Sequence, residues 1–223
     1  MSSSVTEIAN RAITKLGDER LLSLSDDTNA GRVMNSMFAQ VRDAELRRAR
    51  WKFAIKRTSL TALVANPLFG YQYQYPLPAD YIALVQVNDY YVRSLSKNNG
   101  PWSVERLSDD SGTGLLTDLP APLNFRYVSR ITDASRFDPL FVECLACKLA
   151  LEACESLAKG LVNKDGLRQE YKFALIAAAA ADAIENPPDE FPWGSWLDAR
   201  EGPNTGLTGS DQFPVGVSGF VIV

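Results

Sequence analysis

The chain has 223 residues, of which 46% are hydrophobic, and carries a net charge of −4. This share of apolar side chains is ample for a packed core, so the composition excludes a chain that is disordered throughout. The sequence contains no histidine, which excludes catalytic triads built on histidine and removes the commonest metal ligand.

The charges are unevenly distributed along the chain. Residues 186–223 hold five acidic residues and one basic residue, so the remainder of the chain is neutral overall. Within that remainder, residues 42–57 hold seven basic and two acidic residues. A basic segment and an acidic C-terminal segment in one chain favour docking, between copies or onto a partner, through complementary electrostatic fields.

Two amphipathic helices are predicted near the N-terminus. Apolar residues at steps of three and four predict a helix over 4–16 that ends at Gly17. A second helix is predicted to begin near Asp27 or Thr28 and to end at about residue 50. Trp51 and Phe53 come directly after it and are interpreted as core residues.

A strand pattern replaces the helical pattern from residue 66 onward. Tyrosines alternate with glutamines over 71–75, and 81–87 is a run of β-branched and aromatic residues. Further strands are predicted at 90–95, 102–107 and 123–130, separated by glycines and prolines. The pattern predicts a small antiparallel β unit between the second and third helices.

The segment 138–160 has the clearest helical period in the chain. Asp138 fits the N-cap, Pro139 fits the first turn, and Gly160 fits a left-handed C-terminal cap. Apolar residues cover most of the surface of this helix, so it is predicted to lie at the centre of a bundle. A short connection then leads to an antiparallel helix at about 165–185, in which the alanine run 177–181 permits close helix packing.

The predicted fold class is mainly α with inserted β (α+β). An antiparallel bundle of about four helices is assigned to residues 1–65 and 136–186, a β-rich unit to 66–135, and an extended C-terminal arm to 187–223. The arm is rich in proline and glycine, yet it carries apolar residues that are expected to bind a partner. These are Trp193, Trp196, Phe213, Phe220, Val221, Ile222 and Val223.

No membrane contact is expected from the sequence. The N-terminus lacks the continuous apolar region of a signal peptide, and the longest apolar run, 173–181, is too short to cross a bilayer. The cysteines Cys144, Cys147 and Cys154 lie on one predicted helix at offsets that do not suit a local disulfide. The protein is therefore expected to be made in the cytoplasm.

The residues that could carry chemistry are few. A single Cys-x-x-Cys motif inside a helix favours core packing over zinc binding. Gly112 and Gly114 lack the lysine of a phosphate-binding loop and are interpreted as turn residues. No catalytic residue, metal or cofactor is expected, and the adjacent acids Asp109–Asp110 and Asp189–Glu190 are interpreted as solvated, although paired carboxylates could serve glycosidic cleavage.

The basic segment allows two interpretations, contact with DNA phosphates or an interface between proteins. Acidic residues interrupt it, and Trp51 and Phe53 within it are interpreted as core residues, so an interface or a solvated face is favoured over DNA contact. The residues assigned to this interface or lumen patch are Arg42, Arg47, Arg48, Lys52 and Lys56.

Six phrases, in order around the predicted β unit, carry a family resemblance. They are VTEIANRAITKLG at 5–17, LLSLSDDTNA at 21–30, VRDAELRRARWKFAIKRTSL at 41–60, YQYPLPADYIAL at 73–84, FDPLFVECLACKLALEA at 137–153 and GSWLDAR at 194–200. In these phrases the chain resembles the head-to-tail adaptor of short-tailed bacteriophages, also called tail tubular protein A, whose relatives include the tail accessory factors that extend the portal.

The resemblance implies a structural virion protein. It implies a homo-oligomeric, dodecameric ring that joins the portal protein to the tail nozzle, with double-stranded genome DNA passing through its lumen. It also implies that the C-terminal arm reaches toward the portal or a neighbouring subunit. Two alternatives stay open: a head-completion or neck protein of a long-tailed phage, and a tail-associated wall-degrading enzyme that uses carboxylates.

Overall fold

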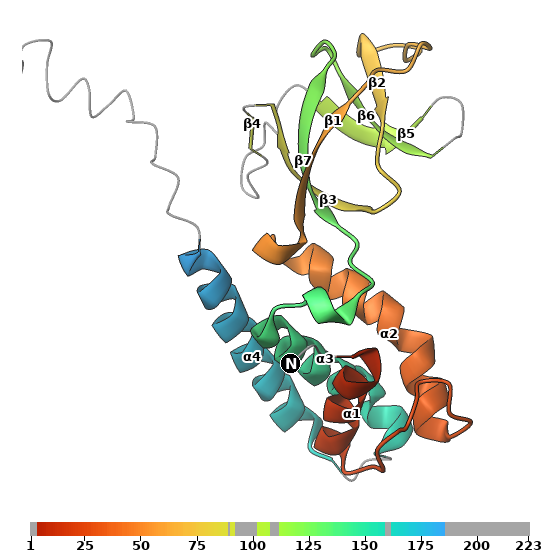
Figure 1. Ribbon diagram of the computed structural model, residues 1–223, viewed down its shortest axis with the longest axis vertical. Coiled ribbons are helices and arrows are strands. Elements are labelled where there is room, and N and C mark those ends of the chain that lie inside the picture. Colours follow the sequence, from red (N-terminus) through yellow and green to blue (C-terminus); the bar gives the residue numbers. More distant parts are fainter. Residues whose placement is uncertain (1–3, 89, 92–101, 108–111, 159–161, 186–223) are drawn as a thin grey trace, which may run out of the picture. The chain divides into compact units, whose positions relative to one another are not determined.

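The computed structural model describes residues 4–88, 90–91, 102–107, 112–158 and 162–185. These residues form four α-helices and two antiparallel sheets, which confirms the predicted α+β class (Figure 1). The helices are α1 (Val5–Leu16), α2 (Asn29–Arg48), α3 (Pro139–Leu157) and α4 (Lys164–Ile184). Along the chain, the strands β1 to β7 follow α2 and precede α3.

Capping residues define the ends of the helices. The Ser4 hydroxyl accepts a hydrogen bond from the N–H of Glu7, and Gly17 ends α1 in the left-handed conformation with a φ of 73°. At α3, the Asp138 carboxylate accepts hydrogen bonds from two backbone N–H groups, and Pro139 occupies the first turn. The predicted helix starts are confirmed, whereas the predicted cap Gly160 lies outside the described residues.

Helix α3 is the centre of the helical bundle, as predicted. It packs against α1, α2 and α4 (Figure 1). Phe141, Leu145 and Leu149 are fully buried along its length. Each such side chain contributes about 1.5–3 kcal/mol relative to an exposed position, so α3 supplies much of the core of the bundle.

An aromatic cluster lies between the bundle and the first strand. The ring centroids of Trp51 and Phe141 are 5.2 Å apart, and those of Phe53 and Phe141 are 5.0 Å apart. The Trp51 indole N–H donates to the carbonyl oxygen of Glu45 at 2.8 Å, which satisfies its polar group inside the core. The prediction that Trp51 and Phe53 are core residues is confirmed.

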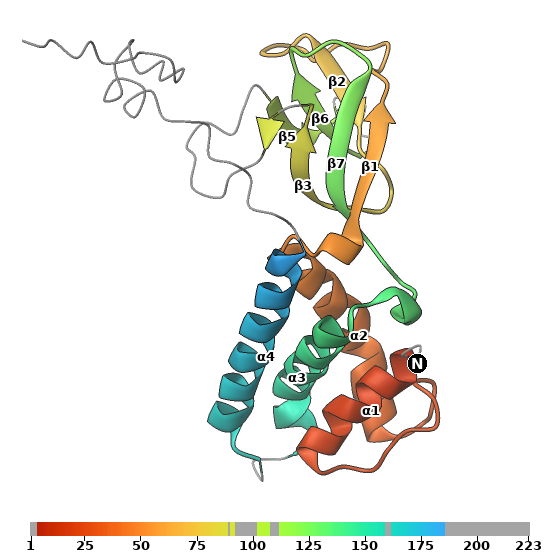
Figure 2. The ribbon, with the colours of Figure 1, turned by 60° about the vertical axis from the view of Figure 1, so that its left-hand side comes forward.

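The strands form two layers (Figure 2). The four-stranded sheet has the order β1 (Ile55–Leu60), β7 (Leu123–Ser129), β3 (Tyr81–Val87) and β4 (Tyr90–Tyr91). The three-stranded sheet has the order β2 (Tyr73–Pro76), β6 (Thr113–Thr117) and β5 (Trp102–Arg106). A second core is built from their side chains, with Leu60, Tyr75, Val87, Trp102, Leu115, Leu123, Phe125 and Tyr127 buried.

Two details of the predicted β unit are wrong. Strand β1 begins at residue 55, after a short 3-10 helix at Lys52–Ala54, and not after residue 66. The sequence IKRTSL has little strand signal of its own, because pairing with β7 defines it. Gly114 is in strand β6 and not in a turn: a Cβ there would lie 2.9 Å from the Tyr75 carbonyl oxygen, so the close approach of β2 requires glycine.

Candidate functional site

The residues of the predicted basic patch have separate partners in the structure. Arg42 is buried, and its Nε donates to the carboxylate of Asp43 at 2.9 Å. Arg47 donates to the carbonyl oxygen of Ile82 on β3 at 2.5 Å. Arg47 therefore links α2 to β3, whereas Arg42 pairs with a neighbour in α2 itself.

The other three basic residues reach other elements. The Arg48 guanidinium lies 5.6 Å from the centre of the Tyr171 ring on α4. The backbone N–H of Lys52 donates to the Asp182 carboxylate at 2.7 Å. The Lys56 ammonium bonds the Asp80 carboxylate at 2.9 Å. These contacts do not gather the five residues at one point, and their role in docking stays a prediction.

A carboxylate is buried between α2 and α4. The Glu45 side chain is 1% exposed, and its two oxygens lie 2.8 and 2.9 Å from the Tyr171 hydroxyl. Arg48 Nη1 lies 3.8 Å from the same carboxylate. Burial, followed by the hydrogen bond with Glu45, raises the pKa of Tyr171 above its ordinary value, so the hydroxyl stays protonated and can donate.

The three cysteines are free and buried on α3. Burial, with the nearby Glu45 carboxylate as the next cause, raises the pKa of the Cys144 thiol to about 12. Burial likewise raises the pKa of Cys147 to about 11. A thiol that stays protonated at neutral pH is a poor nucleophile, and the buried positions agree with the predicted packing role.

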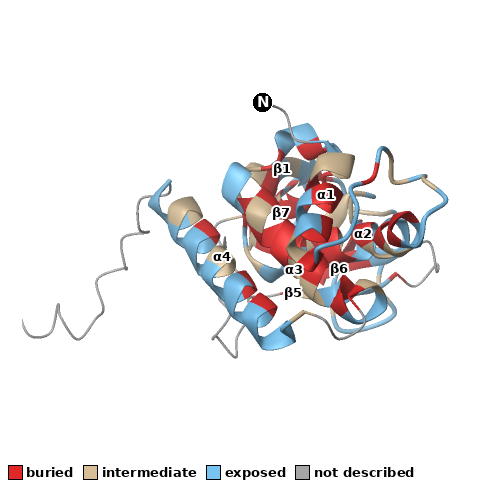
Figure 3. Cartoon of the chain, turned by 90° about the horizontal axis from the view of Figure 1, so that it is seen from below, coloured by how far each residue is buried: buried red, intermediate tan, exposed pale blue. Residues whose placement is uncertain are grey.

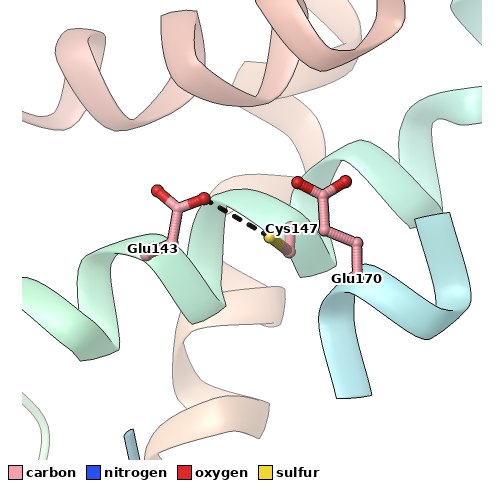
Figure 4. Close-up of side chains that lie close together, drawn as sticks. All are labelled: Glu143, Cys147 and Glu170. Atoms are coloured by element: carbon pink, nitrogen blue, oxygen red, sulfur yellow. Dashed lines mark hydrogen bonds between the residues drawn. The ribbon is translucent and has the colours of Figure 1, made fainter. Parts of the chain in front are cut away.

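A group of possible metal ligands lies where α1, α3 and α4 meet. Glu143, Cys147 and Glu170 each offer a ligand atom, and these atoms lie within 4.8 Å of one another (Figure 4). The Lys15 ammonium from α1 lies 2.8 Å from the Glu143 carboxylate and also bonds Glu170. An ammonium group therefore already supplies the positive charge that these carboxylates need. The cluster is best explained as a group of ion pairs that links three helices, and we call it the Lys15 cluster.

The contacts within the Lys15 cluster shift the pKa values of Lys15 and Glu143. Burial alone lowers the pKa of Lys15, but the hydrogen bonds with Glu143 and Glu170 outweigh it and raise that pKa above its ordinary value. The hydrogen bond from Lys15 lowers the pKa of Glu143. The contribution of Glu143 to stability is therefore present above its ordinary pKa of 4.5 and is lost as the pH falls through the lowered value.

Lys15→Met is expected to lower the free energy of unfolding by about 1 kcal/mol at pH 7, because the two partly exposed carboxylates lose their shared partner. It is also expected to flatten the loss of stability below pH 4.5 that the lowered pKa of Glu143 produces. Urea titrations across pH measure both effects. Lys164→Met is the matched control, because its partner Glu155 is 76% exposed. An equal loss of unfolding free energy in both variants would contradict a stabilising role of the Lys15 cluster.

One side of α4 is exposed (Figure 3), and it carries a stripe of large apolar side chains. Phe173, Ile176 and Ile184 are 72%, 66% and 84% exposed. We call them, with the exposed Ala177 and Ala180 between them, the α4 stripe. The opposite face of α4 buries Leu167, Tyr171 and Ala178.

The α4 stripe was not predicted, although the sequence contains a signal for it. A surface helix needs one apolar face, whereas the run 173–181 places apolar residues around the whole helix. A second face of this kind is typical of contact with another molecule. A smaller exposed apolar group, Val64, Leu68 and Phe69, lies in the connection between β1 and β2.

Several predicted site residues lie outside the described residues. These are the acidic residues Asp109, Asp110, Asp189 and Glu190 and the apolar residues of the arm, Trp193, Trp196, Phe213, Phe220, Val221, Ile222 and Val223. Their assigned roles stay predictions. Within the parts of the chain that the structure describes, no helix combines the length and hydropathy needed to span a membrane.

Neither the known protein-family models nor the curated proteins contain a match to this chain.

Proposed function

We propose that this chain is a structural virion protein that assembles into a homo-oligomeric, dodecameric ring. In this proposal the ring joins the portal protein to the tail nozzle of a short-tailed phage, and genome DNA passes through its lumen. The β-rich unit is an insertion in the helical bundle, and the segment 187–223 is an extended arm that docks on the portal or on a neighbouring subunit.

The observation that supports assembly most strongly is the α4 stripe. Burial of apolar surface stabilises a protein by about 25 cal/mol per Å², and the side chains of the α4 stripe do not gain this stabilisation in the single chain. Contact with a second copy would recover it, and a closed ring repeats one such contact for every subunit. The particular partners, portal and nozzle, come from the resemblance in the six sequence phrases; five of these lie at or beside α1, α2, β2, β3 and α3, and the sixth lies at 194–200 in the arm.

Electron microscopy of the full chain, alone and mixed with purified portal protein, tests the proposal. We expect closed rings, either in the free protein or on the portal. Deletion of residues 203–223 is expected to leave the monomer folded and to abolish assembly with the portal. A full chain that stays monomeric with and without portal contradicts the ring, and a truncated chain that still docks contradicts the role of the arm.

Charge reversal in the basic segment needs a careful choice of residue. Arg48 lies beside the buried Glu45 carboxylate and over the Tyr171 ring, so Arg48→Glu would disturb the core as well as any interface. Lys56 is a cleaner position, because its side chain is exposed and its ion-pair partner among the described residues, Asp80, is itself partly exposed.

A further inference from the structure

The four-stranded sheet has a polar concave face that the proposed ring does not use. An open pocket of about 540 Å³ lies there, lined by Arg57, Thr58, Ser59, Gln86, Asn88, Asn124, Phe125 and Arg126. These residues come from β1, β3 and β7, which are neighbours in the sheet (Figure 2), and from Asn88 at the end of β3. No acidic side chain is among these described residues, and Arg57 and Arg126 make this part of the face basic and rich in hydrogen-bond donors.

Two arginines are cross-strand neighbours on this face. Arg57 of β1 is the direct cross-strand partner of Arg126 of β7, and Gln86 of β3 is the partner of Arg126 on its other side. Side chains of directly opposed residues share one face of the sheet with Cβ atoms about 4.5–5.5 Å apart, and like charges in such a pair destabilise the sheet. Arg57 is exposed, so water screens part of this repulsion, and the larger cost falls on Arg126, whose Nε is buried.

The structure provides no compensating negative charge within the described residues. The Nε of Arg126 is buried and has no hydrogen-bond partner. Neither Arg57 nor Arg126 forms an ion pair with any described carboxylate. A buried donor on a charged group without an acceptor is costly, and it usually marks a place where a ligand, ion or water binds.

The rim of the cavity is held in place by its own hydrogen bonds. The backbone N–H of Asn124 donates to Asn88 Oδ1 at 2.9 Å, and Gln86 Nε2 donates to the carbonyl oxygen of Asn88 at 2.7 Å. The oxygen of the Asn88 amide is thus engaged, which leaves its NH₂ group as a donor. Ser59, two residues from Arg57, shares the face of Arg57 and adds a hydroxyl there, whereas Thr58, opposite Phe125, points to the other face of the sheet.

We propose that this face binds a phosphate group. A guanidinium matches the oxygens of phosphate with two parallel hydrogen bonds, and two opposed guanidiniums can share one dianion. Phe125 is the aromatic residue among the described lining residues, and because it is 2% exposed it offers no surface for stacking a base, so we infer recognition of the phosphate and not of a nucleobase. The phosphate is either free or part of a nucleic-acid backbone, and the proposal does not depend on ring assembly.

Calorimetric titration of the full chain with inorganic phosphate, at constant ionic strength against chloride, tests this site. Arg57→Gln combined with Arg126→Gln is expected to weaken phosphate binding about tenfold or more, because two charge-assisted contacts are lost. The matched control combines Arg20→Gln with Arg32→Gln, which removes the same charge at exposed positions far along the chain from the sheet. This control is expected to bind phosphate as the wild type does.

A second measurement separates loss of the site from loss of the fold. In phosphate-free buffer the Arg57→Gln/Arg126→Gln variant is expected to melt at or above the temperature of the wild type, because the like-charge pair is gone. Phosphate is expected to raise the melting temperature of the wild type and of the control only. The proposal is overturned if phosphate raises the melting temperature of the variant as much as that of the wild type. It is also overturned if phosphate does not raise the melting temperature of the wild type.

Two competitors identify the source of the phosphate. If a short DNA duplex displaces inorganic phosphate, and the substitutions lower the salt dependence of DNA binding, the source is a nucleic-acid backbone. If the duplex does not compete, the site takes free phosphate. If a polyglutamate peptide binds the arginine pair and inorganic phosphate does not, the face recognises carboxylates and the proposal is overturned.

Discussion

Replacement of Phe173 and Ile176 by aspartate is expected to abolish self-assembly and to leave the monomer folded. Both side chains are largely exposed in the single chain, so the substitutions remove little of its core. Aspartate lowers helix stability by up to about 0.7 kcal/mol per residue, which a helix of 21 residues packed on α3 tolerates. In an assembled interface the same change places two unpaired charges where apolar contact is needed, which is strongly unfavourable.

Sedimentation velocity and electron microscopy measure the assembly, and circular dichroism measures the fold. Ala179→Asp is the control, because Ala179 is exposed on the same helix and lies about 120° around it from Phe173. Ile184→Asp adds an independent probe at the end of the stripe, where the side chain is 84% exposed. Normal assembly of the double variant would show that the α4 stripe is an ordinary solvated face and not an interface.

Tyr171→Phe is expected to lower the free energy of unfolding by about 2–4 kcal/mol. The substitution removes one hydroxyl and hardly changes the packing, but it leaves the Glu45 carboxylate buried without its closest hydrogen-bond donor. Arg48 Nη1 at 3.8 Å is half exposed and cannot fully replace that donor. Chemical denaturation followed by fluorescence measures the loss.

Tyr127→Phe is the matched control for this prediction. The Tyr127 hydroxyl also donates to a carboxylate, that of Asp80, at 2.8 Å. Asp80 is 34% exposed and keeps Lys56 as a partner, so we expect a loss of only about 0.5–1.5 kcal/mol. Equal losses in the two variants would show that burial of Glu45 does not decide the effect.

A double-mutant cycle isolates the interaction. Glu45→Met combined with Tyr171→Phe replaces both polar partners by apolar groups of similar volume, which is expected to be less destabilising than the sum of the single changes by about 1 kcal/mol or more. Additive losses would mean that the two groups contribute separately. The raised pKa of Tyr171 adds a pH test: its contribution to stability is present below pH 10 and is lost at higher pH.

Local sequence signals predicted the helices well. Asp138 and Pro139 mark the start of α3, Gly17 marks the end of α1, and the apolar period identifies α3 as the helix that others surround. These signals act within a few residues of the chain, through caps and through side chains on one helix face. The α+β class followed from them together with the tyrosine alternation before β3.

Strand pairing could not be predicted in the same way. Strand β1 is polar along most of its length, and its partner β7 lies far away in the chain, so no local pattern identifies it. The sequence suggested a turn at Gly114, because glycine favours turns as well as close packing between strands. The sequence suggested one basic patch at 42–57, whereas its residues extend into a helix, a 3-10 helix and a strand.

The sequence by itself determined where the chain is helical, where it is apolar and that histidine chemistry is absent, because these properties depend on composition and near neighbours. Only the tertiary structure decided which distant groups meet. It paired Glu45 with Tyr171, Lys15 with Glu143 and Glu170, and Arg57 with Arg126, and it left Phe173 and Ile176 in water. Packing of whole helices and the register of whole strands bring such groups together, and a single segment contains neither.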